Sequence, residues 1–112
     1  MDYKSLNNEL ISTFEVKENK IVNETFKVKQ MGFLQLRDIL LGLGRIYKED
    51  FESNIYTVII NGGFRKKNKT ISMFKLTEEG ISVAMYAKEG LINQHTCEGV
   101  MDEFRRRIEK YL

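Results

Sequence analysis

The one histidine and the one cysteine of this chain lie two positions apart, as His95 and Cys97. Such a pair supplies a nucleophile and its base when the two side chains meet. Residues two apart on a helix project about 200° from each other, however, and Cys97 falls on the apolar side of a predicted helix. One histidine and one cysteine also provide too few ligands for a closed metal site. We therefore expect a protein that is not an enzyme and that uses no metal or cofactor.

A basic cluster is the second group of residues with chemical potential: Arg65, Lys66, Lys67 and Lys69. A flexible basic loop binds a phosphate backbone or an acidic partner, and the same composition is also typical of a solvated turn. The net charge is only +2, from 18 basic and 16 acidic residues, so total charge does not indicate a nucleic-acid partner. Nucleic acid is the less favoured partner of this cluster.

Composition indicates one folded domain over residues 1–112. Hydrophobic residues make up 42% of the chain and charged residues 30%, which is typical of globular proteins. No apolar run approaches the roughly 20 residues that span a bilayer, and the first residues lack the order of a signal peptide. We expect an intracellular, cytoplasmic protein without membrane contact, and a single cysteine agrees with a reducing compartment.

The segment Ile55–Ile60 is apolar at both alternating sets of positions. A strand of this kind needs an interior place in a sheet and a cover on each face. Two alternating segments follow, at 70–76 and 81–85, and the residues 77–80 between them end in a glycine that suits a tight turn. The three segments predict an antiparallel meander.

Residues 10–30 alternate in polarity around a polar loop at 18–20, which predicts a hairpin of two strands. The alternative is a helix at the N-terminus, because Tyr3, Leu6, Leu10 and Phe14 also follow helical spacing. Residues 3–9 fit that helix best.

Two further segments have helical periodicity. One begins at Phe33 and ends between Leu43 and Lys48, with Gly42 and Gly44 near its end. The other has a narrow apolar side from Cys97 to Tyr111. The expected fold is α+β: a single antiparallel sheet of about five strands, in the order ββαβββα, with both helices packed on one face.

The residues Met-Phe-Lys-Leu-Thr-Glu-Glu-Gly at 73–80 resemble the end of the wing and the start of the following helix in winged-helix DNA-binding domains. That resemblance implies wing strands at 55–60 and 70–76, a wing tip at 65–69, a recognition helix at 33–43 and a helix after residue 76. The proposed recognition helix is mostly Leu, Ile and Phe, whereas base edges are read by hydrogen-bonding side chains.

Our leading hypothesis is a small protein-interaction module that associates with itself or with another protein through a sheet face. The candidate interface is Tyr56, Val58 and Ile60, or the alternate residues Ile55 and Ile59, because two helices cover only one face of the sheet. The alternatives are a winged-helix DNA-binding protein and a domain that binds a small apolar ligand between the long helix and the sheet.

Overall fold

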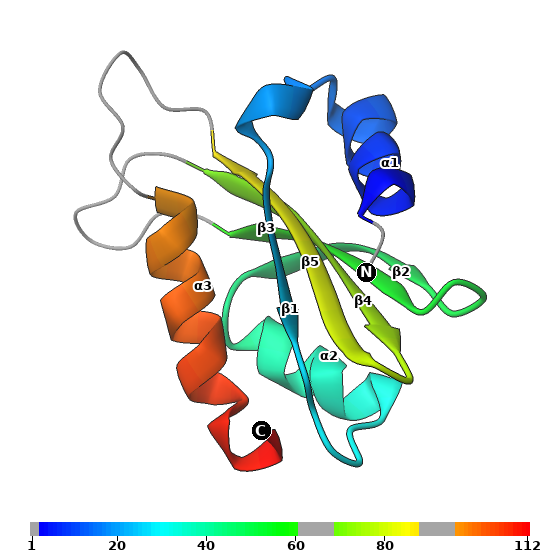
Figure 1. The fold of residues 1–112 in the computed structure, drawn as a ribbon, viewed down its shortest axis with the longest axis vertical. Helices are drawn as coiled ribbons and strands as arrows, with labels where there is room; N and C mark the ends of the chain where they lie inside the picture. The colour runs from blue at the N-terminus through cyan, green and yellow to red at the C-terminus, as the bar shows by residue number, and fades with distance from the viewer. Residues whose placement is uncertain (1–2, 61–68, 88–95) are drawn as a thin grey trace.

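The computed structural model describes residues 3–60, 69–87 and 96–112. Its described strands form one antiparallel sheet in the spatial order β1-β5-β4-β3-β2 (Figure 1). The strands are β1 (Val22–Phe26), β2 (Arg45–Asp50), β3 (Ile55–Ile60), β4 (Thr70–Thr77) and β5 (Gly80–Ala87). The α-helices are α1 (Lys4–Phe14), α2 (Phe33–Leu41) and α3 (Thr96–Arg107). The predicted α+β class and the five-stranded antiparallel sheet are confirmed.

The predicted meander is present as β3, β4 and β5. Strand β3 lies between β2 and β4, so its interior place in the sheet is confirmed. The turn from β4 to β5 brings Thr77 opposite Gly80, whose φ of +136° lies in the region that glycine tolerates. The Thr77 hydroxyl accepts a hydrogen bond from the Glu79 N–H at 3.2 Å and holds the turn closed.

Helices cover both faces of the sheet. Helices α2 and α3 pack on one face, over a core that includes Leu36, Phe74 and Phe104, and α1 packs on the other through Leu6 and Leu10. In Figure 1 the strands pass between α1 and α3. Two helices on one face were predicted correctly, and α1 adds a third layer, on the other face, that the expected fold lacked.

The predicted N-terminal hairpin is wrong in its first strand. Residues up to Phe14 belong to α1, which ends where Glu15 adopts a left-handed conformation with φ of 55°. The predicted loop at Glu18–Lys20 is a short 3-10 helix, and β1 then pairs with β5. This segment forms a helix rather than a strand because helical spacing places Leu6 and Leu10 together against the sheet.

The predicted end of the long helix, between Leu43 and Lys48, is wrong, because the helix ends before this range and a strand that the sequence did not predict follows it. Helix α2 ends at Leu41, and β2 begins at Arg45. Gly44 lies so close to β3 that a Cβ atom on it would come within 2.6 Å of the Ile59 carbonyl oxygen. The absent side chain thus permits the chain to turn from the helix directly into the sheet.

The winged-helix resemblance is wrong about the segment after Leu76. Residues 77–80 close a β-hairpin, and β5 follows where the family has a helix. Helix α2 also differs from a recognition helix, because its Leu36 and Leu40 are fully buried against the sheet.

Candidate functional site: an open sheet edge

The candidate interface residues Tyr56, Val58 and Ile60 are buried beneath α2 and α3. The chain itself therefore covers the face that these three residues occupy, and they offer no surface to a partner. The alternates Ile55 and Ile59 point to the other face, where α1 provides part of the cover and both side chains are half-buried. The second cover that β3 requires is thus supplied partly from within the chain.

The remaining candidate residues are only partly described. Arg65, Lys66 and Lys67 lie outside the described residues, and Lys69 is exposed just before β4. His95 also lies outside the described residues. Cys97 is buried in the core on α3, as its place on the apolar side of the helix predicted.

The space between α2 and the sheet is filled by side chains. Leu36, Leu40 and Tyr56 are fully buried there, where the apolar-ligand alternative expected a cavity. The Tyr56 hydroxyl donates a hydrogen bond of 2.7 Å to the Phe33 carbonyl oxygen, and burial raises the pKa of that hydroxyl. The Phe33 and Tyr56 rings stack with centroids 3.9 Å apart.

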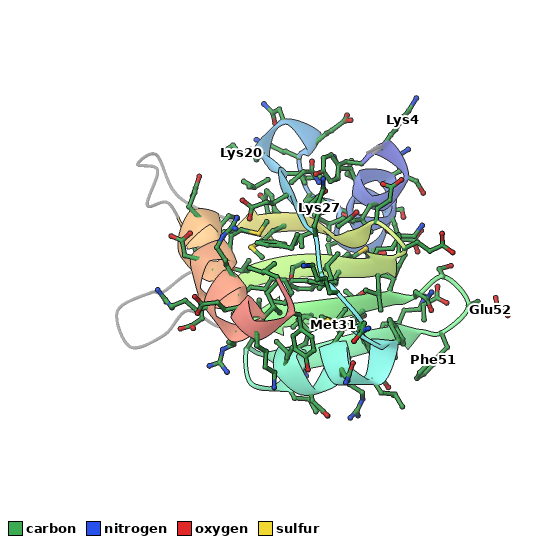
Figure 2. All side chains as sticks on the ribbon, turned by 60° about the horizontal axis from the view of Figure 1, so that its bottom comes forward. Lys4, Lys20, Lys27, Met31, Phe51 and Glu52 are labelled. Atoms are coloured by element: carbon green, nitrogen blue, oxygen red, sulfur yellow. The ribbon has the colours of Figure 1, made fainter. Side chains whose placement is uncertain are left out.

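This stack continues to the molecular surface. Phe51, in the loop between β2 and β3, forms a T-shaped contact with the Phe33 ring at a centroid distance of 5.3 Å. Figure 2 shows Phe51 beside α2, at the end of the sheet that carries this loop. Three rings thus connect an exposed aromatic residue to the buried core, which fixes the position of the loop.

Exposed apolar side chains gather along the same edge of the sheet. The exposed large hydrophobic residues of the described chain are Leu34 (64% exposed), Leu41 (49%), Tyr47 (56%), Phe51 (60%) and Leu112 (42%). All except Leu112 belong to α2, to β2 or to the loop after β2. Strand β2 is the last strand of the sheet and has a described neighbour on one side only. An apolar border therefore accompanies strand backbone that no other described strand pairs with.

A groove of about 400 Å³ follows this edge. It is lined by Arg37, Leu41, Gly44, Arg45, Ile46, Tyr47, Lys48 and Glu49. Arg37 of α2 forms an ion pair with Glu49 of β2. The hydrogen bond from the Arg37 Nε–H to the Glu49 carboxylate raises the pKa of the Arg37 guanidinium. This ion pair joins the two elements on either side of the groove.

A bulge in β2 determines which side chains share a face. The pairing of β2 with β3 shifts between Ile46 and Lys48, so Tyr47 is the extra residue. The Tyr47 ring contacts Phe14 of α1 at a centroid distance of 5.4 Å and so lies on the α1 face. Tyr47 and Lys48, although consecutive, therefore lie on the same face, because Lys48 is opposite Thr57, which also faces α1.

A second cavity, of about 490 Å³, lies between the start of α1 and the β4–β5 hairpin. Apart from Leu6, its lining residues are polar or charged, and they carry both charges: Ser5, Leu6, Lys75, Thr77, Glu78, Glu79 and Ser82. The open edge at β2 differs from it in exposing both apolar side chains and unpaired backbone, which are the two features that protein partners use.

The sequence reasoning missed this edge because β2 itself was not predicted. The available signal was the presence of Tyr47 and Phe51 within a strongly charged segment, where solvated loops rarely carry large apolar residues.

Comparison of the chain with protein-family models, with curated proteins and with solved structures found no match. Among the described helices, none has the length and apolar character needed to cross a membrane.

Proposed function

We propose that this chain is a small interaction module without enzymatic activity, and that it self-associates through the open edge at β2. The observation that carries the proposal is the concentration of exposed apolar residues on α2, β2 and the following loop. Exposed apolar residues that gather on neighbouring elements are typical of interaction sites, whereas single scattered ones are common on any protein.

Strand pairing explains how the edge gains a partner. The outward backbone groups of β2 offer hydrogen bonds to an added strand, and apolar side chains on both sides of the strand add contact area. Leu41 lies on α2, along the groove, and Tyr47 lies on the α1 face. A partner strand laid against β2 thus contacts apolar groups both above and below the sheet.

A second copy of the chain supplies the required strand without any other component. Pairing of β2 with β2 joins two sheets through the same surface on each copy, which is the isologous contact of a two-fold dimer. A contact of this kind is small, so we expect a weak dimer in exchange with the monomer.

The proposal is tested with Leu41→Gln, which places a polar amide in the lining of the groove. We expect dimerisation of the variant to be at least about tenfold weaker, because two unpaired amides are buried in each dimer. Sedimentation equilibrium across a range of concentrations measures the dissociation constant.

The matched control is Leu112→Gln, because Leu112 is exposed to a similar extent and lies outside the edge. Its dissociation constant should equal that of the unchanged chain. Equal weakening by both variants, or a chain that stays monomeric at millimolar concentration, would contradict the proposal.

A further inference from the structure

We infer that the two copies pair their β2 strands antiparallel in one register, with Arg45 of each copy opposite Asp50 of the other. This inference rests on the proposed self-association and specifies how the second copy is recognised. It follows from the distribution of faces and charges along Arg45–Asp50.

The faces of β2 form a symmetric pattern. Arg45 and Asp50 lie opposite Ile59 and Ile55, and both therefore face α1. Ile46 and Glu49 lie opposite Val58 and Tyr56 on the α2 face, as the Arg37–Glu49 ion pair also requires. Tyr47 and Lys48 both face α1. From Arg45 to Asp50 the side chains therefore face α1, α2, α1, α1, α2 and α1, and this order is the same when it is followed from Asp50 back to Arg45.

This symmetry selects the register. Residues directly opposite each other in a sheet share a face. Pairing Arg45 with Asp50 also pairs Ile46 with Glu49 and Tyr47 with Lys48, and each pair then shares a face. A shift by one or by two residues places at least one pair of side chains from opposite faces against each other, and a shift by three leaves half of the strand unpaired. A one-residue slip is the error that a sheet with two packed faces excludes most strongly.

Charge favours the same arrangement. The first half of β2 carries Arg45, Lys48 follows in the middle, and the second half ends with Glu49 and Asp50. In the antiparallel register each Arg45 meets an Asp50, and each Lys48 lies beside a Tyr47 ring. A parallel pairing in register places Arg45 against Arg45 and Asp50 against Asp50, which is repulsive.

The same residues explain why the edge does not pair indiscriminately. Charged side chains and a bulge on an edge strand discourage addition of unrelated strands. Here the bulge and the charges are compatible with one partner strand, the antiparallel copy, and they oppose other strands and registers. Such an edge combines attraction to one partner with repulsion of others.

The test uses two single variants, Arg45→Glu and Asp50→Lys. In the homodimer of Arg45→Glu, each Glu faces Asp50 of the other copy, and in that of Asp50→Lys each Lys faces Arg45. We expect each variant alone to dimerise about tenfold more weakly than the unchanged chain, because two symmetric pairs become repulsive. Mixed in equal amounts, the variants should form a heterodimer about as strong as the unchanged dimer.

Native mass spectrometry identifies the heterodimer by its mass, and sedimentation velocity measures its affinity. Thermal unfolding checks that each variant is folded, because the Asp50 carboxylate accepts hydrogen bonds of 3.1 Å from the Glu52 and Ser53 N–H groups. Asp50→Asn retains an acceptor oxygen at this turn and removes the charge, and it should weaken the dimer by less than Asp50→Lys.

A mixture that associates no more tightly than either variant alone, while the unchanged chain dimerises, would overturn the register and leave self-association standing. Single variants that dimerise as tightly as the unchanged chain would also overturn the register and leave self-association standing. A monomeric unchanged chain would overturn both the register and the proposed function.

Discussion

Replacing Gly80 with alanine is expected to lower the free energy of unfolding by about 2 to 5 kcal/mol. Gly80 has φ of +136°, a conformation that strains any residue with a Cβ atom. That Cβ atom would also lie 2.2 Å from the Phe26 carbonyl oxygen, well inside contact distance. The end of β1 must therefore move away from β5, which removes part of the pairing between these strands.

Urea unfolding measures the loss, and hydrogen exchange locates it. Exchange should accelerate most in β1, because Phe26 belongs to that strand. Gly32→Ser is the control, since Gly32 caps α2 in an extended conformation and the nearest atom to an added Cβ is 3.6 Å away. Serine is a good cap, so this variant should be as stable as the unchanged chain or more stable. Equal stability of Gly80→Ala and the unchanged chain would contradict the described turn.

Replacing Phe104 with alanine is expected to cost about 3 to 5 kcal/mol. Phe104 is fully buried where α3 meets the sheet. Its ring contacts the Phe26 ring edge-on at 5.2 Å between centroids and the Phe74 ring at 4.8 Å. Removal of the ring leaves a cavity beneath α3 and deprives two other aromatic rings of their neighbour. The loss is large because a domain of this size has only about 5 to 15 kcal/mol of stability in total.

The control for this substitution is Glu103→Ala, one residue earlier on the same helix. Glu103 forms exposed ion pairs with Arg106 at 3.4 Å and Arg107 at 3.7 Å. Exposed pairs contribute little, so the free energy of unfolding should change by less than about 0.5 kcal/mol. Similar losses from both substitutions would show that α3 does not pack on the sheet through Phe104.

The sequence predicted well those elements whose apolar pattern is long and regular. The segment of β3 is apolar at both alternating sets of positions, and those of β4 and β5 alternate over five or more positions. The turn between β4 and β5 contains a glycine at the residue with positive φ. The apolar side of α3 was also predicted, with Cys97 in the core. Local periodicity and tertiary packing agree at these positions, and one period dominates each segment.

Prediction failed where helical and alternating spacing competed in one segment, and where a strand carries too few apolar residues to show a pattern. Phe14 fits both the alternating and the helical pattern, and only the packing of α1 on the sheet decides between them. Strand β2 begins inside the range where the helix was predicted to end, and its last residues, Lys48, Glu49 and Asp50, carry no apolar pattern. An edge strand is packed on fewer sides and therefore needs fewer apolar residues than an interior strand.

The candidate site was the least predictable feature. The pattern of β3 indicated two covered faces, and it contained no information about which cover would come from the chain itself. Helices α2 and α3 occupy the face of Tyr56, and α1 partly covers the face of Ile55. The exposed apolar residues that remain, such as Leu34 and Phe51, come from segments flanking β3 rather than from β3 itself. The arrangement of elements in space thus moved the candidate interface from a sheet face to a sheet edge.

An association through β2 also has a structural consequence within each copy. Phe51 is connected to the core through the Phe33 and Tyr56 rings, and Arg37 joins α2 to β2. These contacts hold the strand and its flanking helix in place before a partner arrives. A preorganised edge loses less conformational entropy on binding than a mobile segment does, which favours a small interface.

Nuclear Overhauser contacts between copies provide the most direct measurement of the central proposal. In a dimer made from isotopically labelled and unlabelled chains, only protons of different copies give the filtered signal. We predict contacts between the α-protons of Tyr47 in one copy and Lys48 in the other, and between residues near Arg45 and Asp50, with intensity that rises with protein concentration. Filtered contacts confined to α1 or α3, or none at millimolar concentration, would contradict association through the β2 edge.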